Sequence, residues 1–230
     1  MAGHIATAGR SDWTTPKLIV ETVREVFGGT IALDPCSNER SIVHATREYL
    51  LPKDDGLVDS WDFHTIFVNP PYGRCYMHKV TKEFLDSKDY RLLSKEQKKE
   101  YKTSTVADWC TRAYKAYAEG SEVIMLIPAA VDTKHWQQNI LRTASMVNFL
   151  RGRVHFDGAG PAPMATALVY WGVHSELFSE NTFKLGSPVD LTGNVYYVLP
   201  DLATPCINCN VREGKSDKFC SYACKVTHKQ

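Results

Sequence analysis

The chain has 230 residues, a formal net charge of +1 and a hydrophobic fraction of 43%. This length suits one main domain with a small appendage, and the hydrophobic fraction suffices for a full core. The near-neutral charge excludes a protein that binds nucleic acid through its global charge, so any basic surface must be local. No apolar run reaches the length of a membrane span, and we therefore expect a cytoplasmic protein with no membrane partner.

The first predicted element is a helix. Residues 1–10 are small and polar, and we expect them to be disordered. Thr15 can then serve as an N-cap, with Pro16 at the first helical position. The turn before the helix, with Trp13 and Thr15, is also a candidate wall of a cofactor pocket. Apolar residues follow at helical spacing and two glycines end the helix: Leu18, Ile19, Val23, Val26, Phe27, Gly28 and Gly29.

Two short strands with acidic turns come next. Residues 30–33 predict a first strand that ends at Asp34, and residues 48–51 predict a second. An acidic residue at such a strand end can meet the polar half of a nucleoside cofactor, but Asp34 is equally suited to be a helix N-cap. Asp54 and Asp55 lie in a polar turn, where one carboxylate can accept hydrogens from the cofactor's adenine amine. Ordinary turn residues are the alternative.

The third predicted strand ends in Asn-Pro-Pro-Tyr, residues 69–72. Residues 66–68, Ile-Phe-Val, predict a strand buried on both faces, as in the interior of a parallel sheet. Pro70 and Pro71 have no N–H to give to a ladder, so the strand must stop at Asn69. An amide side chain, free carbonyls and an aromatic ring remain at its carboxyl end, where open α/β sheets bind ligands.

Residues 69–72, which we call the hook, suit chemistry on the exocyclic amine of a nucleobase. Such an amine is a poor nucleophile because its lone pair is delocalised into the ring. The side-chain oxygen of Asn69 and the carbonyl of Pro70 can each accept one of its hydrogens, which draws the nitrogen toward tetrahedral geometry. Tyr72 can stack on the base, a contact worth about 1–3 kcal/mol. An ordinary turn with a proline pair is the alternative.

The rest of the chain alternates helices with strands. Residues 76–106 are a possible insertion, with eight Lys/Arg and five Asp/Glu between positions 79 and 102. A solvated helical hairpin is favoured there over an arm that contacts DNA. The predicted helices cover residues 109–119 and 133–141, and the predicted strands cover residues 123–128, 147–150 and 167–171. This alternation predicts a doubly wound, Rossmann-like α/β sheet.

Six short motifs lie in order along the chain. They are Asp-Trp-x-Thr-Pro at 12–16, Leu-Asp-Pro at 33–35, Asp-Asp-Gly-Leu at 54–57, Asn-Pro-Pro-Tyr-Gly-Arg at 69–74, Leu-Ile-Pro-Ala at 126–129 and Leu-Arg-Gly-Arg at 150–153. Their order and spacing over residues 11–172 resemble those of the phage-type DNA adenine-N6 methyltransferases. The resemblance implies a methyltransferase domain, for which we take residues 11–200, and S-adenosyl-L-methionine as its cofactor.

The resemblance also implies roles for single residues. It places catalysis at Asn69, Pro70, Pro71 and Tyr72. It places cofactor binding near Thr15, Pro16, Asp34 and Asp55, and with their neighbours the predicted cofactor-binding residues are Trp13, Thr15, Pro16, Asp34, Pro35, Cys36, Asp55 and Asn69. Arg74, Arg151 and Arg153 are expected to contact DNA, the last two from a glycine-containing loop suited to phosphates. The turn after Asp34 lacks the glycine pair found in many methyltransferases.

The last part of the chain, residues 201–230, predicts a zinc-binding tail. Cys206 and Cys209 are followed, after ten residues, by Cys220 and Cys224. Two close cysteine pairs with this spacing are typical of a tetrahedral four-thiolate zinc site, and so short a tail depends on its metal to fold. Contact with DNA and a purely structural staple are both open roles for the tail.

The sequence as a whole predicts an S-adenosyl-L-methionine-dependent methyltransferase that acts on N6 of a flipped-out adenine in DNA. Cytosine-N4 methylation and RNA-adenine methylation are the enzymatic alternatives, because the hook contacts an amine and not a sugar. A non-catalytic DNA-binding module with a zinc tail is the alternative from another class. The resemblance to a bacteriophage family places the expected site of action in the cytoplasm of a bacterial host.

Overall fold

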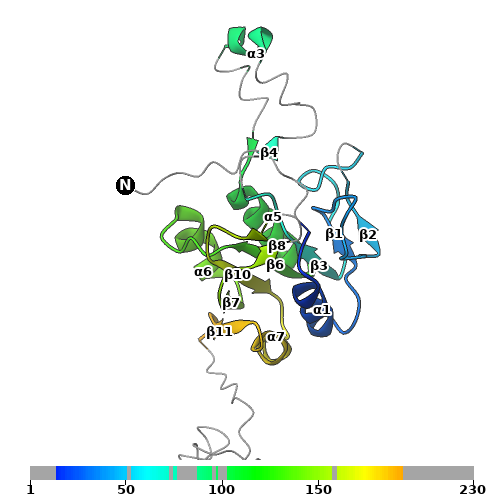
Figure 1. The fold of residues 1–230 in the computed structure, drawn as a ribbon, viewed down its shortest axis with the longest axis vertical. Coiled ribbons are helices and arrows are strands. Elements are labelled where there is room, and N and C mark those ends of the chain that lie inside the picture. The colour runs from blue at the N-terminus through cyan, green and yellow to red at the C-terminus, as the bar shows by residue number, and fades with distance from the viewer. Residues whose placement is uncertain are drawn as a thin grey trace, which may run out of the picture. The chain divides into compact units, whose positions relative to one another are not determined.

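A seven-stranded mixed sheet forms the centre of the protein (Figure 1). The computed structural model describes residues 14–50, 53–72, 75–76, 87–94, 97, 103–156 and 160–193. The chain divides into the units Met1–Thr192 and Gly193–Gln230, and all elements discussed below belong to the first.

The elements have the following bounds. The strands of the central sheet are β1 (Leu33–Asp34), β2 (Arg47–Glu48), β3 (Thr65–Val68), β6 (Glu122–Pro128), β7 (Met146–Leu150), β10 (Thr166–Trp171) and β11 (Gly186–Asp190). Two small ribbons pair β4 (Cys75–Tyr76) with β5 (Thr103–Ser104) and β8 (His155–Phe156) with β9 (Gly160–Pro161). The helices are α1 (Lys17–Val26), α3 (Lys88–Leu92), α5 (Val106–Ala118), the π-helix η1 (Trp136–Ile140), α6 (Leu141–Thr143) and α7 (Ser175–Thr182).

The strand order β11-β7-β10-β6-β3-β1-β2 reverses direction beside β1. The chain runs outward from β1 to β2 and then returns to β3 on the other side of β1, with all these strands parallel. β6 continues the parallel half, whereas β10 is antiparallel to both β6 and β7. The carboxyl ends of β1 and β3 therefore flank the crevice where open α/β sheets bind their ligands.

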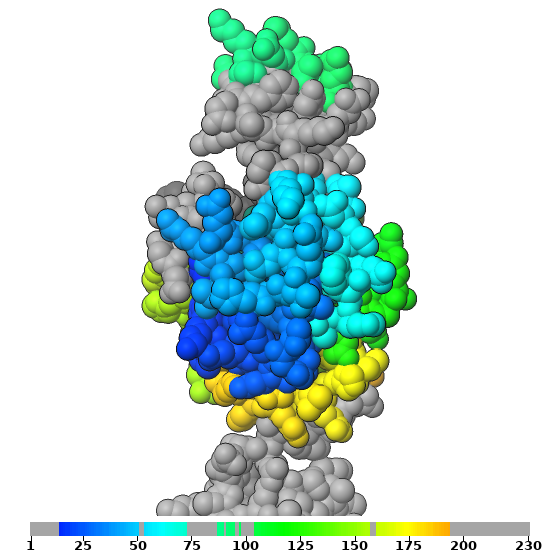
Figure 2. All heavy atoms as spheres, turned by 90° about the vertical axis from the view of Figure 1, so that its right-hand side faces the viewer, coloured from blue at the N-terminus to red at the C-terminus, as the bar shows by residue number. Residues whose placement is uncertain are grey.

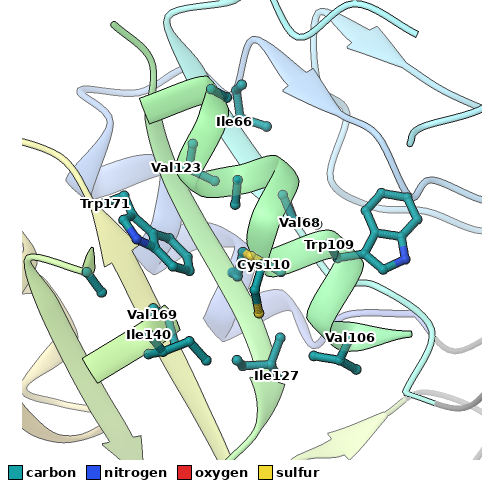
Figure 3. Packing of buried hydrophobic residues seen from close by; sticks show 14 of the residues in the cluster. Ile66, Val68, Val106, Trp109, Cys110, Val123, Ile127, Ile140, Val169 and Trp171 are labelled. Carbon is teal, nitrogen blue, oxygen red and sulfur yellow. The ribbon is translucent and has the colours of Figure 1, made fainter. Parts of the chain in front are cut away.

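The core confirms the two most apolar predicted strands. Residues 66–68 of β3 and residues 123–127 of β6 are essentially inaccessible to solvent. Helix α5 covers one face of the sheet, where Cys110 and Val106 lie in the same cluster as Ile127 (Figure 3). Thr105 and Asp108 form a capping box that starts α5 at Val106, three residues before the predicted start.

Helices also cover the opposite face of the sheet. On β10, Val169 and Trp171 belong to the cluster beneath α5, whereas Tyr170 between them stacks on Phe178 of α7 with ring centroids 4.9 Å apart. Helix α1 contacts α7, and Figure 2 shows the dark blue residues of α1 beside the yellow residues that include α7. The doubly wound α/β prediction is therefore confirmed.

The first helix differs from the prediction at its start. Pro16 and not Thr15 is the N-cap of α1, and no side chain caps the helix. The Thr15 hydroxyl is instead bonded to Asn69, so it does not cap the helix. Leu18, predicted on the apolar face, is 55% exposed. The end is as predicted, because Gly28 and Gly29 adopt positive φ angles of 69° and 110°.

Several other elements differ from the prediction. β1 is shorter and includes Asp34, and the predicted helix over residues 133–141 is largely the π-helix η1. The chain after the hook enters β4, which pairs with β5, where a helix was expected. Most of the predicted insertion, including residues 77–86, lies outside the described residues. The structure also contains α7, β11 and the β8–β9 ribbon, which the sequence patterns did not predict.

Within the described part of the chain, no helix combines the length and the apolar character needed to span a membrane.

Candidate active site

One edge of the sheet collects most of the predicted site residues. Asp34 ends β1, and Asn69 follows directly after β3 on the neighbouring strand. Arg151 follows β7, which runs parallel to β6 because both strands are antiparallel to β10. The carboxyl ends of these parallel strands lie at the same edge, so the topology brings together groups that are up to 117 positions apart in the sequence.

Asn69 is held at this edge by a side-chain hydrogen bond. Its Nδ2 donates a hydrogen bond of 3.0 Å to Oγ1 of Thr15, in the turn before α1. Its Oδ1 receives no hydrogen bond from the described part of the chain. Pro70, the next residue, is buried and, like Pro71, has no N–H with which to continue the strand. The amide therefore presents an unoccupied acceptor at the end of β3.

Tyr72 is fixed at both ends of its side chain. Its hydroxyl donates a hydrogen bond of 3.3 Å to the Leu126 carbonyl of β6. Its ring meets the ring of Phe156 edge-on, with centroids 5.9 Å apart and an interplanar angle of 75°. Burial raises the pKa of the Tyr72 hydroxyl above its ordinary range, so the group stays protonated. The side chain can thus offer a ring surface, and it is unsuited to act as a base.

Asp34 is a buried carboxyl group. Only 4% of the residue is exposed, and Oδ1 accepts a 2.9 Å hydrogen bond from the Cys36 N–H. Burial raises the pKa of Asp34 from its ordinary 3.8 to about 7; the Cys36 hydrogen bond opposes this rise, and the charge of Glu48 adds to it. A turn follows Asp34 and no helix begins there, so the helix N-cap alternative is wrong.

The structure distinguishes the two neighbouring aspartates. Both carboxylate oxygens of Asp54 already have partners. Its Oδ1 lies 2.6 Å from Arg47 Nη2, and its Oδ2 accepts a hydrogen bond from the Leu50 N–H. Asp55 is 8% exposed and accepts a 3.0 Å bond from the Leu57 N–H through Oδ1. Its Oδ2 is buried and has no hydrogen-bond partner among the described residues. An unsatisfied buried acceptor is costly, so Asp55 is the carboxylate suited to receive a ligand.

Gly56 lets the two acidic turns approach each other. A Cβ atom on Gly56 would lie 2.0 Å from the Pro35 carbonyl oxygen and 2.9 Å from the Trp109 ring. No side chain fits that space, so the turn after Asp34 and the turn of Asp55 touch only because this residue is glycine. Gly56 belongs to the Asp-Asp-Gly-Leu motif that the sequence analysis singled out, but its close approach to Pro35 and Trp109 was not predicted.

Two of the residues predicted to contact DNA precede a strand that packs on the hook. Arg151 and Arg153 are exposed and precede β8. Phe156 of β8 is only 2% exposed and supplies the ring against Tyr72, so this segment is physically connected to the hook. The sequence patterns did not identify Phe156.

The remaining predicted site residues divide into two groups. Pro16, Pro35, Cys36 and Pro71 lie in the turns that border this edge, with Cys36 half-buried. Trp13, Arg74 and the four tail cysteines Cys206, Cys209, Cys220 and Cys224 lie outside the described residues. Within the described ranges, no group of three or more His, Cys, Asp and Glu side chains is arranged to hold a metal ion.

Comparison with known protein families gives a match over most of the chain. The model of the family described as DNA N-6-adenine-methyltransferase (Dam) matches residues 3–168. A search of curated proteins found no match. The matched range includes every described residue of the hook and of both acidic turns.

The buried carboxyl of Asp34 predicts a specific pH dependence of stability. Between about pH 4 and pH 7 the folded protein keeps a proton on Asp34 that the unfolded chain has released. The Asp34 proton therefore adds to the free energy of unfolding. This stabilisation is complete below the ordinary pKa of an aspartate and is lost as the pH rises toward 7, with a slope of at most about 1.4 kcal/mol per pH unit. In Asp34→Asn this contribution should vanish, and denaturant titrations across this pH range should give a less negative slope.

The exposed Asp62 before β3 provides the matched control. Asp62→Asn should keep the wild-type slope. The same slope in Asp34→Asn as in the wild type would show that Asp34 is not the group responsible.

Proposed function

The chain belongs to the Dam family of DNA N-6-adenine-methyltransferases, and on that premise we propose that the hook activates the adenine amine. Asn69 Oδ1 and the Pro70 carbonyl would each accept one of the N6 hydrogens. The observation that carries this proposal is the orientation of the Asn69 amide, whose nitrogen is bonded to Thr15 while its oxygen has no partner within the described residues. The family favours adenine in DNA over the cytosine and RNA alternatives, and it favours an enzyme over a non-catalytic module.

Family membership implies S-adenosyl-L-methionine, which supplies an electrophilic methyl group on a sulfonium sulfur. With this cofactor bound, the N6 lone pair would form the bond to the methyl carbon as the carbon–sulfur bond breaks and its electron pair goes to sulfur. N6 then loses one proton to water, so the reaction requires no general base from the chain. The part of the protein is to localise the lone pair on N6 and to hold the amine in line with the methyl group.

The target adenine would have to leave the duplex. The amide and carbonyl of the hook cannot reach N6 while the base is stacked in a helix, so we propose a flipped-out base, as in other enzymes that modify bases. The ring of Tyr72 would stack on it. Its hydroxyl bond to Leu126 and its ring contact with Phe156 fix the orientation of that ring in advance, which reduces the entropy lost on binding.

The acidic turns fit the cofactor. Asp55 Oδ2 is a buried acceptor without a described partner, and we assign it to the adenine amine of the cofactor. Asp34 is a buried carboxyl with a pKa raised to about 7, which suits a cationic or hydroxyl-bearing part of the ligand. Gly56 keeps both turns in contact. Other proposed cofactor contacts come from the bordering turns: Trp13, Pro16, Pro35 and Cys36.

Two further parts of the proposal concern DNA and zinc. Arg74, Arg151 and Arg153 would hold DNA phosphates beside the hook, since phosphate contacts position a duplex without reading its sequence. Cys206, Cys209, Cys220 and Cys224 would bind structural zinc, which rests on their spacing alone. A cytoplasmic site of action follows from the substrate.

The central prediction concerns Asn69→Ala. Loss of one acceptor for the amine should lower single-turnover methylation by about 10²–10³, the usual effect of removing one transition-state hydrogen bond. Cofactor affinity should change little. Asn181→Ala is a matched control, because the Asn181 side chain donates to the Leu177 carbonyl within its own helix, α7. Near wild-type turnover in a folded Asn69→Ala enzyme would refute the proposed role.

A second prediction concerns the arginines. Arg151→Gln and Arg153→Gln should weaken binding of all DNA sequences similarly, and each should flatten the slope of log affinity against log salt by about 0.9. Lys115→Gln is the control, because Lys115 pairs with Glu119 near the start of β6, away from the hook. An unchanged salt slope in both arginine variants would contradict phosphate contact at this loop.

A third prediction concerns the tail. Metal analysis of the purified chain should find zinc, and Cys206→Ser with Cys209→Ser should abolish it, because a four-thiolate site does not tolerate loss of half its ligands. Cys36→Ser, at a cysteine in the acidic turn, should leave the zinc content unchanged. A wild-type chain that contains no zinc after purification in zinc-supplemented buffer would disprove the site.

A further inference from the structure

The amide of Asn69 has two ends of nearly equal shape and opposite function. The oxygen accepts hydrogen bonds and the NH₂ group donates them. Only the orientation with Oδ1 toward the substrate accepts a hydrogen from an amine. With the amide rotated by half a turn, two donors face each other and the substrate loses its acceptor. The activity of the hook therefore depends on a group that holds the amide in this orientation.

Thr15 is the residue that holds the amide in this orientation in the structure. Its Oγ1 accepts the hydrogen bond from Asn69 Nδ2 at 3.0 Å, and the residue is only 4% exposed. The hydroxyl does not cap the helix, because α1 begins with Pro16 as its N-cap and without a side-chain cap.

The backbone around Thr15 is anchored on both sides. The Pro16 carbonyl accepts the first bonds of α1, from the Ile19 N–H at 3.0 Å and the Val20 N–H at 3.2 Å. On the other side, the Thr14 hydroxyl donates a 3.4 Å bond to the Arg40 carbonyl. The hydroxyl of Thr15 therefore reaches Asn69 from a fixed turn, which is the arrangement needed for a lasting orientation.

We propose that Thr15 is a positioning residue for methyl transfer, which holds the Asn69 amide so that Oδ1 faces the target amine. This inference rests on the proposed role of Asn69. It assigns the Thr15 hydroxyl a different task from direct cofactor contact, the task expected from the sequence. The two tasks have separate signatures, since a positioning residue affects the rate of transfer and a cofactor contact affects the affinity for the cofactor.

The test compares Thr15→Val with Thr15→Ser. Valine keeps the shape and removes the hydroxyl, whereas serine keeps the hydroxyl. Thr15→Val should lower single-turnover methylation roughly tenfold, a factor in the range of one hydrogen bond's net contribution, with the dissociation constant of S-adenosyl-L-methionine unchanged by calorimetry. Thr15→Ser should retain most of the rate. Weakened cofactor binding with an unchanged rate at saturation would overturn the proposal in favour of direct cofactor contact.

A second background separates orientation from simple packing. In Asn69→Ala there is no amide for Thr15 to hold. Adding Thr15→Val to Asn69→Ala should therefore change the single-turnover rate by less than about twofold, measured with enzyme in excess so that slow transfer is still quantified. An equal tenfold loss in both backgrounds would show that Thr15 acts through packing. Failure of the amine-activation proposal itself would be recognised separately, by full activity of Asn69→Ala.

Discussion

The candidate active site depends on the residue at which strand β3 ends. Pro70 and Pro71 have no N–H to offer, so the ladder with β1 and β6 ends at Val68. The strand order reverses beside this strand, which opens a crevice at the carboxyl ends. Asn69 is the first residue beyond the ladder, and its side chain is free to bond to Thr15 and to a ligand. The buried strand holds the hook in place because three of its residues are inaccessible to solvent.

Two buried acidic groups at the same edge of the sheet lower the stability of the fold, and a bound ligand would remove this penalty. Asp34 keeps its proton to about pH 7 because it is buried, and Asp55 Oδ2 has no partner among the described residues. Isolated buried acceptors and carboxylates destabilise a fold unless something pairs with them. A cofactor that brings an amine, hydroxyl groups and a positive charge would satisfy both groups. The two buried acidic groups are therefore of the kind that could pair with the polar groups of the family's cofactor.

How far the sequence predicted this arrangement depends on the range of the interactions. The apolar runs in β3 and β6 and the proline pair are local signals, and both the parallel strands and the hook followed from them. β11 has the sequence Gly-Ser-Pro-Val-Asp, which is an edge strand without an apolar run and carries no such signal. The bond between Thr15 and Asn69 spans 54 positions, and a helix cap was the better local explanation for Thr15. Only the packed turns show that Asp54 is occupied by Arg47 while Asp55 is not.

The proposed role of the hook is to direct methyl transfer to the N6 amine of adenine in DNA. The most direct test is incubation of the chain with methyl-labelled S-adenosyl-L-methionine and DNA of mixed sequence, followed by digestion to nucleosides and separation of the products. We expect the label in N6-methyladenine. Label confined to N4-methylcytosine would contradict the assignment of the target base, and label found only when RNA replaces DNA would contradict the assignment of the substrate.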